Sequence, residues 1–197
     1  MEITNSEFLT SVAKKESILD LGAKEFAFVG RSNCGKSSLI NFLTNKKNLA
    51  KTSSTPGHTK LINYFWVNKN KDNKFILVDL PGYGFSKAGK RTNESWSELI
   101  ESYLLGSKNL SRVFVLMDIR HEPSGLDKLM IEFLYYNQIP FTVLATKADK
   151  IPKSKIPQYV KVVANGLKIA VGNVLFTSSL DRTGREKILE RIEKDLK

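Results

Sequence analysis

The chain lacks the features that mark secreted or membrane-embedded proteins. Its 197 residues contain a single cysteine, Cys34, so no disulfide can form within the chain and a reducing compartment suits it. No run of about 18 apolar residues is present, so no membrane span is expected. The first residues, MEITN, have neither the basic start nor the apolar middle of a secretory signal. We therefore expect a cytoplasmic protein.

Acidic residues are also scarce relative to basic ones. Lysine and arginine total 31, against 20 aspartate and glutamate residues, which gives a formal net charge of +11. A field of that sign attracts polyanions, so nucleic acid or a ribonucleoprotein is the expected class of partner. The alternative is a lysine-rich surface that only keeps the protein in solution. The length fits one domain, and nothing in the sequence resembles a dimerisation helix, so we expect a monomer.

Short apolar runs alternate with longer helical patterns along the chain. Most of the short runs are continuously apolar, as in strands that are buried on both faces of a parallel sheet. Between them, one amphipathic helix is expected to end at Gly106, and the last helix is expected to begin with a capping box at Thr183 and Glu186. The expected strands are residues 26–29, 61–67, 74–80, 112–119, 140–146 and 174–177.

This alternation predicts an α/β fold of three layers, α/β/α, around a mostly parallel six-stranded sheet with one antiparallel strand. The antiparallel strand follows from the polar turn at 68–73, which is too short for a crossover, so the strands on either side should form a hairpin. Residues 1–24 are interpreted as an N-terminal lead-in, with a helix considered at 6–15. Residues 25–197 are expected to form a single domain.

The segment GRSNCGKSS, residues 30–38, has the spacing of the phosphate-binding loop of P-loop NTPases and lies between an expected strand and an expected helix. Its backbone amides would surround a β-phosphate, and the helix N-terminus would add a favourable dipole. Lys36 would bridge the β- and γ-phosphates, and the Ser37 hydroxyl would bind Mg²⁺. A glycine-rich turn with a surface lysine is the alternative. The loop residues assigned to nucleotide binding are Gly30, Arg31, Ser32, Asn33, Cys34, Gly35, Lys36, Ser37 and Ser38.

A second motif, DLPG, begins at Asp79, where the expected strand 74–80 ends. A carboxylate in this place is typical of the Mg²⁺ shell of nucleotide triphosphatases. The amide of Gly82 would approach the γ-phosphate with no side chain in the way. We therefore assign Asp79 to the metal and Gly82 to the reacting phosphate.

A third motif, TKAD, follows the expected strand 140–146 and indicates which base is bound. The Asp149 carboxylate can accept hydrogen bonds from N1–H and the exocyclic amine of guanine, a donor pair that adenine lacks. Lys147 would lie along the purine plane, and Thr146 completes the motif. The turn after the last strand would place Ser178 and Ser179 near the guanine O6, although a simple strand-ending turn explains these serines nearly as well.

The segment SSTPGHT, residues 53–59, connects the first helix to the second strand, and its composition is typical of a mobile connector. One of its threonines should complete the Mg²⁺ shell when the γ-phosphate is present. We choose Thr59 over Thr55 because it directly precedes the strand, and we include Gly57 in the nucleotide site. The expected metal ligands are therefore Ser37, Thr59 and Asp79.

These motifs occur in an order and spacing that closely resemble the EngB family of bacterial GTPases, also called YihA or YsxC. The resemblance rests on GRSNCGKSS, STPGHTKLINYF, DLPGYGFSK and TKAD, and it extends over nearly the whole chain. It implies a Ras-like G domain, Mg²⁺-dependent GTP hydrolysis to GDP, a role in maturation of the large ribosomal subunit, and a link to cell division and septation. The chain departs from the family pattern at His58-Thr59-Lys60, and it has Ser179 where many GTPases have alanine.

One position predicts slow hydrolysis. Ras-like GTPases usually have a glutamine after DxxG that orients the attacking water, whereas this chain has Tyr83. Similar GTPases with a hydrophobic residue there often bind K⁺ through an asparagine of the phosphate loop, and Asn33 matches that asparagine. The alternative is that Asn33 only bonds its own loop. We expect Lys36, Asn33, Thr59 and Gly82 to contribute to catalysis.

Three basic clusters lie outside the nucleotide site and suggest contact with ribosomal RNA and proteins. They are Lys46-Lys47 with Lys51, the lysines of 69–74, and Lys87, Lys90 and Arg91. The leading hypothesis is a GTP-dependent switch that acts on the large ribosomal subunit. The alternatives are a G domain that serves RNA modification or septation, and an RNA-binding module that the nucleotide only stabilises.

Overall fold

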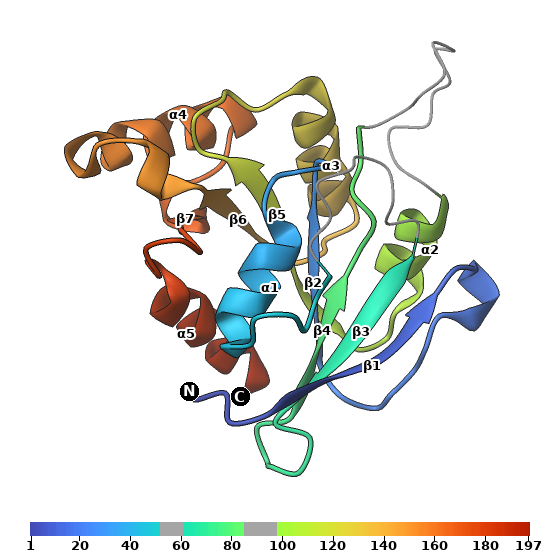
Figure 1. The fold of residues 1–197 in the computed structure, drawn as a ribbon. Helices are drawn as coiled ribbons and strands as arrows, with labels where there is room; N and C mark the ends of the chain where they lie inside the picture. Colours follow the sequence, from blue (N-terminus) through green and yellow to red (C-terminus); the bar gives the residue numbers. More distant parts are fainter. Residues whose placement is uncertain (52–60, 85–97) are drawn as a thin grey trace.

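The computed structural model describes residues 1–51, 61–84 and 98–197, which form a seven-stranded sheet with helices on both faces (Figure 1). Two further residue ranges, 52–60 and 85–97, lie outside this description. The strands are β1 Ser6–Val12, β2 Glu25–Gly30, β3 Ile62–Val67, β4 Phe75–Asp79, β5 Leu110–Asp118, β6 Phe141–Thr146 and β7 Val174–Phe176. The longer helices are α1 Lys36–Thr44, α2 Glu98–Gly106, α3 Gly125–Tyr136, α4 Ile156–Leu167 and α5 Arg185–Leu196. This architecture confirms the predicted fold class.

The strands lie in the order β1-β3-β4-β2-β5-β6-β7. Neighbouring strands from β4 to β7 pair in parallel, while β3 runs antiparallel to both β4 and β1. The hairpin predicted around the turn at 68–73 is present, with Val67 opposite Phe75 at its closed end. The prediction from the short polar turn, that β3 runs antiparallel to β4, is therefore confirmed.

The first 24 residues differ from the prediction. Ser6–Val12 is a strand and not part of a helix, and it adds a seventh strand to the sheet. Its partner, β3, has a largely apolar sequence that would otherwise be an exposed sheet edge. Phe8 lies edge-on against Phe65 with ring centroids 5.7 Å apart. Burial of the β3 edge thus outweighs the helical pattern, and the segment forms the edge strand of the same sheet.

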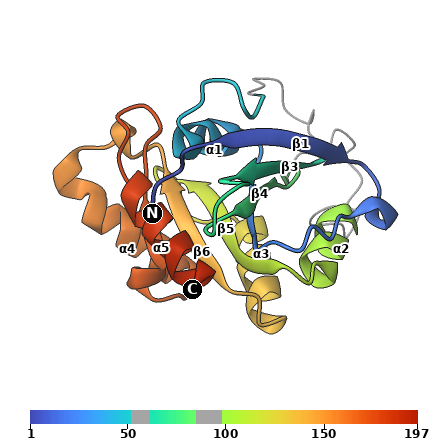
Figure 2. The same cartoon turned by 90° about the horizontal axis from the view of Figure 1, so that it is seen from below.

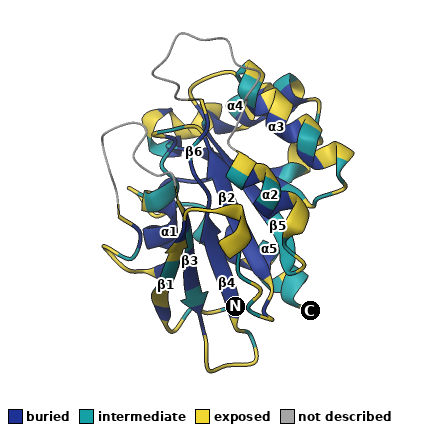
Figure 3. Cartoon of the chain, turned by 90° about the vertical axis from the view of Figure 1, so that its right-hand side faces the viewer, coloured by how far each residue is buried: buried dark blue, intermediate teal, exposed yellow. Residues whose placement is uncertain are grey.

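Successive residues of β2 point to opposite faces of the sheet and separate two hydrophobic cores. Phe26 and Phe28 pack with Phe114 beneath α1 and α5, whereas Ala27 and Val29 face α2, α3 and α4. Figure 3 shows the central strands as buried along their length and the outer faces of the helices as exposed. The N-terminus lies against α5, where the Met1 ammonium contacts Glu193 at 2.7 Å (Figure 2). The sheet is therefore covered by helices on both of its faces.

Helix ends show one further difference. α2 ends at Gly106 as predicted, but Thr183 does not cap α5. The cap is Gly184, at φ +86°, and the backbone of Thr183 pairs instead with Ser178 in the preceding turn. A Cβ on Gly184 would come within 2.4 Å of the Phe176 carbonyl oxygen, so only glycine fits there. The close turn after β7 thus overrides the capping sequence.

A buried carboxyl group joins α2 to the start of β2. Glu25 is fully buried, and its Oε2 accepts hydrogen bonds from the Tyr103 hydroxyl at 2.7 Å and the Ser107 hydroxyl at 2.8 Å. Its Oε1 has no hydrogen-bond partner among the described residues. Burial raises the pKa of the Glu25 carboxyl above its ordinary value, and the two hydrogen bonds offset only part of this effect.

The raised pKa predicts how stability changes with pH. The folded protein keeps the Glu25 proton to a higher pH than the unfolded chain, so this group lowers the free energy of unfolding as pH rises from about 4.5 to its folded pKa. Glu25→Gln removes that loss. We expect the variant to gain stability over the parent protein across this pH range, measured by urea unfolding. Glu7→Gln, at an exposed carboxyl group, is the control, and a difference that is constant with pH would contradict the prediction.

Candidate functional site

The loop between β2 and α1 has the strand–loop–helix setting predicted for a phosphate-binding loop. A Cβ on Gly30 would lie 2.6 Å from the Leu116 carbonyl oxygen and 2.7 Å from the Cys34 Sγ, so glycine is required there. Gly35, at φ +94°, is the residue that turns the chain into α1. Burial raises the pKa of the Cys34 thiol to about 11, so it stays protonated. The predicted loop residues 30–38 therefore form one turn at the N-terminus of α1.

Lys36 and Asp79 lie next to each other in this site. Lys36 is the first residue of α1 and Asp79 is the last residue of β4, and the Lys36 Nζ forms an ion pair with the Asp79 Oδ1. Both side chains are largely buried, with 10% and 4% exposed. Ser37 follows Lys36 on the first turn of the helix. The structure thus brings Lys36, predicted to hold phosphate, together with Asp79, predicted to hold Mg²⁺.

The DLPG segment packs directly against the phosphate-binding loop. The Tyr83 amide donates to the Gly30 carbonyl at 3.2 Å, and the Ser32 amide donates to the Tyr83 carbonyl at 3.3 Å. A Cβ on Gly82 would lie 3.2 Å from both the amide nitrogen and the Oγ of Ser32. This close approach explains why residue 82 is a glycine, and it places the Gly82 backbone beside the loop.

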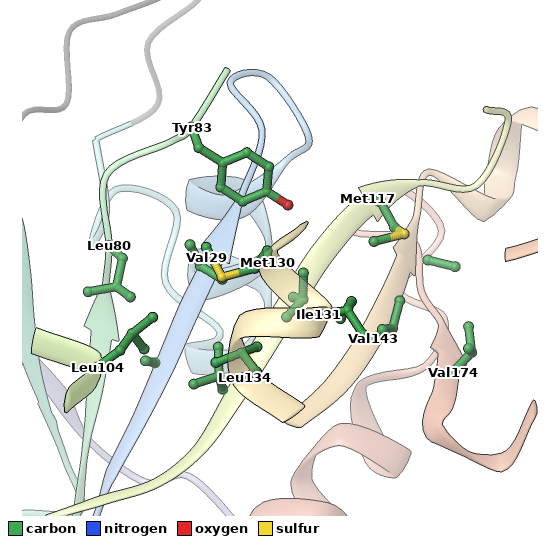
Figure 4. Close-up of a cluster of buried hydrophobic side chains, with 14 of the residues drawn as sticks. Val29, Leu80, Tyr83, Leu104, Met117, Met130, Ile131, Leu134, Val143 and Val174 are labelled. Atoms are coloured by element: carbon green, nitrogen blue, oxygen red, sulfur yellow. The ribbon is translucent and has the colours of Figure 1, made fainter. Parts of the chain in front are cut away.

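The side chain of Tyr83 packs into the hydrophobic core. It is 2% exposed and belongs to the core around Val29 and Met130 (Figure 4). The hydroxyl donates to Asp127 Oδ1 at 2.8 Å, and burial, together with that carboxylate, raises the Tyr83 pKa well above its ordinary value. Asp127 also caps α3, since its Oδ2 accepts from the Ser124 amide at 2.8 Å. Tyr83 therefore fastens the DLPG segment to α3.

The TKAD residues lie where β6 ends, next to the phosphate-binding loop. The Thr146 hydroxyl donates to the Cys34 carbonyl at 2.7 Å, and the Lys147 Nζ donates to the Asn33 carbonyl at 3.0 Å. Asp149 accepts a hydrogen bond from the Ser178 hydroxyl at 2.7 Å. That bond, with further help from Lys150, lowers the pKa of the Asp149 carboxyl and keeps it ionised. Both predicted halves of a guanine nucleotide site are therefore joined by direct contacts.

Asp118 was missed in the sequence, although it orients Lys147. It is the last residue of β5, and its Oδ2 lies 3.1 Å from the Lys147 Nζ and 2.7 Å from an Arg120 guanidinium nitrogen. Burial opposes ionisation of Asp118, but the hydrogen bonds from Arg120 and Lys147 outweigh it and hold the pKa well below its ordinary value. The sequence feature that could have identified Asp118 is its position as a carboxylate at the end of an apolar strand, like Asp79.

We expect Asp118→Asn to weaken binding of GTP and GDP by a similar factor, about 3- to 10-fold. The substitution removes the charge that holds Lys147, so more side-chain freedom is lost when Lys147 packs on the base. Nucleotide titration by fluorescence measures both affinities. The control is Glu7→Gln, which breaks an exposed ion pair far along the sequence from the site. An effect on GTP alone would show that Asp118 acts on the γ-phosphate and not through Lys147.

Several predicted site residues lie outside the described part of the chain. These are Gly57 and Thr59, together with the basic residues Lys87, Lys90 and Arg91. Ser38 and Ser179 are described, and both line a hollow beside α1. Within the described ranges, no three histidine, cysteine, aspartate or glutamate side chains form a metal cluster, and no helix is long and apolar enough to cross a membrane.

Known proteins resemble this chain along its whole length. The family described as "50S ribosome-binding GTPase" matches residues 25–147. The probable GTP-binding protein EngB of Pelotomaculum thermopropionicum is 48% identical over 193 residues, which cover 98% of this chain and 96% of that protein. EngB of Clostridium beijerinckii is 44% identical, with the same coverage.

Solved structures show the same fold. The crystal structure of a probable GTP-binding protein engB has a TM-score of 0.68 at 23% identity and covers 87% of this chain and 98% of its own. Aquifex aeolicus Era bound to GDP and aluminium fluoride has a TM-score of 0.72 at 22% identity, with 88% of this chain and 56% of that chain covered. Taken with the joined phosphate and guanine motifs, these similarities show that the chain belongs to the EngB family of GTP-binding proteins and is a GTPase.

Proposed function

We propose that this GTPase is a cytoplasmic switch that assists assembly of the large ribosomal subunit and is needed for normal growth and division. The observation that carries the proposal is the contact between the phosphate-binding loop and the TKAD motif, where the Lys147 Nζ donates to the Asn33 carbonyl. Lys36 and Asp79 form an ion pair beside it, and the chain matches a family described as ribosome-binding. The net charge of +11 suits an RNA-rich partner. Era, which has the same fold, has been crystallised with nucleotides of 16S ribosomal RNA, which supports RNA as the contact.

The donor set at Ser37 and Asp79 fits Mg²⁺, which prefers hard oxygen ligands and is usually held by one or two protein groups with phosphate oxygens. Thr59 is the third ligand that we propose. The metal would supply positive charge beside the β- and γ-phosphates. Lys36 would exchange its contact with Asp79 for the phosphates, while the amides of the loop and of Gly82 would orient the γ-phosphate for attack by water.

Slow intrinsic hydrolysis follows from the position of Tyr83. Its hydroxyl is buried against Asp127 and cannot orient the attacking water. We propose that K⁺, held in part by the Asn33 side chain, supplies additional positive charge. Asn33 is exposed, and its side chain forms no hydrogen bond with the described residues. Its φ of +66°, however, gives an independent reason for asparagine at this position.

Two substitutions separate these roles of Asn33. Asn33→Gly keeps the positive φ but removes the amide, whereas Asn33→Ala loses both. We expect GTP turnover to be about 10-fold faster in KCl than in NaCl for the parent protein, and equal in the two salts for both variants. Release of phosphate measures the rates. Equal parent rates in both salts would remove K⁺ from the mechanism, and a K⁺ effect that survives in Asn33→Gly would leave Asn33 a structural residue.

Co-sedimentation with purified large ribosomal subunits tests the proposed function. We expect binding with a non-hydrolysable GTP analogue to exceed binding with GDP, and to persist at moderate salt. Small subunits serve as the control for general affinity to RNA, because nonspecific binding falls steeply with salt. Binding that is independent of nucleotide, or equal for both subunits, would contradict a role in large-subunit assembly and leave the GTPase activity without an assigned target.

A further inference from the structure

A basic groove runs along the surface between α1 and α5. Two hollows of about 510 and 400 Å³ adjoin there, because both are lined by Phe42 and Arg182. One reaches Ser38 and Ser179 near the nucleotide site, and the other reaches Lys187 on α5. α1 and α5 contact each other on the same face of the sheet (Figure 1). We call the two hollows together the α1–α5 groove.

The charge of the α1–α5 groove is strongly one-sided. Among the described residues that line it, Glu186 is the single acidic one. None of its basic residues forms an ion pair with a carboxylate in the described ranges, although Lys15, Lys69 and Arg112 do so elsewhere. A set of uncompensated cations facing one groove is an anion-binding surface. The basic residues that line it are Lys46, Lys47, Arg182, Arg185 and Lys187.

Uncharged groups hold several of these cations in place. The Arg182 guanidinium lies 5.5 Å from the centre of the Phe42 ring and donates to Asn45 Oδ1 at 2.9 Å. Lys187 lies over Phe176 at 5.5 Å. Contacts of this kind position a cation but leave its charge available to a ligand. The groove is therefore preorganised, which lowers the entropy lost on binding.

Arg185 shows that the cations also act on one another. Its guanidinium donates to the Leu43 carbonyl at 3.0 and 2.8 Å. Burial and then the neighbouring Arg182 lower the pKa of the Arg185 guanidinium, while Glu186 and Glu2 act in the opposite sense. A bound anion would relieve the repulsion between the two arginines. This gives the groove a physical reason to bind phosphate groups.

We propose that the α1–α5 groove binds the phosphodiester backbone of RNA. Several cations spread along an extended groove suit a chain of phosphates better than a single phosphate ion. Leu180, 75% exposed beside Arg182, offers an apolar surface to a base. The inference rests on the proposed ribosomal function and identifies the surface that would contact RNA. It extends the cluster of Lys46 and Lys47 recognised in the sequence to Arg182, Arg185 and Lys187.

A double substitution with a matched control tests the groove. Lys47→Gln with Lys187→Gln removes two exposed charges from it, whereas Lys128→Gln with Lys161→Gln removes two exposed charges from α3 and α4 on the other face of the sheet. Binding to a labelled single-stranded oligouridylate is measured across a salt series. We expect about 10-fold weaker binding for the groove variant and a salt slope lower by about 1.4, with little change for the control. Equal losses in both variants would show a general charge effect and overturn the proposal.

Binding to large ribosomal subunits distinguishes this inference from the proposed function. If the parent protein and the groove variant bind subunits equally well, the groove proposal fails and the ribosomal function stands. If the parent protein does not bind subunits while the groove variant still loses affinity for oligouridylate, the ribosomal function fails and the groove stands as an RNA site. Basal GTP hydrolysis without RNA should be unchanged in both variants.

Discussion

Lys36→Ala is expected to lower kcat/KM for GTP by about 10²- to 10³-fold, as the loss of one well-placed cation at a developing charge usually does. In the structure, Lys36 leaves the phosphate-binding loop at the start of α1 and contacts the buried carboxylate of Asp79. The substitution removes the positive charge assigned to the β- and γ-phosphates. Release of phosphate at several GTP concentrations gives kcat and KM separately.

Loss of the ion pair could by itself destabilise the protein, because breaking a buried pair typically costs about 3–5 kcal/mol. Thermal unfolding of the variant therefore accompanies the kinetics, and Lys36→Arg serves as a control that keeps the charge while changing its geometry. A folded Lys36→Ala protein with near-normal kcat/KM would show that Lys36 serves Asp79 and not the phosphates.

Asp149→Asn is expected to weaken GTP binding by about 10³-fold and to favour xanthosine triphosphate over GTP. The carboxylate is fixed by the Ser178 hydroxyl at 2.7 Å and kept ionised by it. Asparagine keeps an oxygen for Ser178 but presents an amide donor to the base, which suits the second carbonyl of xanthine. Unsatisfied buried donors give discrimination of this size.

Competition between the two nucleotides for the purified variant measures this exchange. Asp72→Asn is the matched control, since Asp72 is an exposed carboxylate in the turn between β3 and β4. We expect Asp72→Asn to bind GTP normally. Unchanged GTP affinity in Asp149→Asn would overturn the assignment of guanine as the base.

The sequence was sufficient for the parts of this protein that depend on local order along the chain. The motifs GRSNCGKSS, DLPG and TKAD each come at the end of an apolar strand. Parallel strands end at the same edge of their sheet, so residues that follow them lie near one another. This rule agrees with the contact of Lys36 with Asp79 and the contact of Lys147 with the Asn33 carbonyl. The polar turn at 68–73 likewise predicted the antiparallel hairpin.

Contacts between distant segments decided the rest. Ser6–Val12 became a strand because β3 offered an unpaired apolar edge, which no local pattern in residues 1–24 reveals. Asp118 and Tyr83 acquired their roles from Lys147 and Asp127, residues 29 and 44 positions away. Such pairings depend on burial and on the charge of the partner, and not on periodicity. The sequence by itself determined the fold class and the guanine nucleotide chemistry. Only the tertiary structure showed which groups orient the nucleotide-site residues and where the α1–α5 groove lies, because both depend on which side chains meet in space.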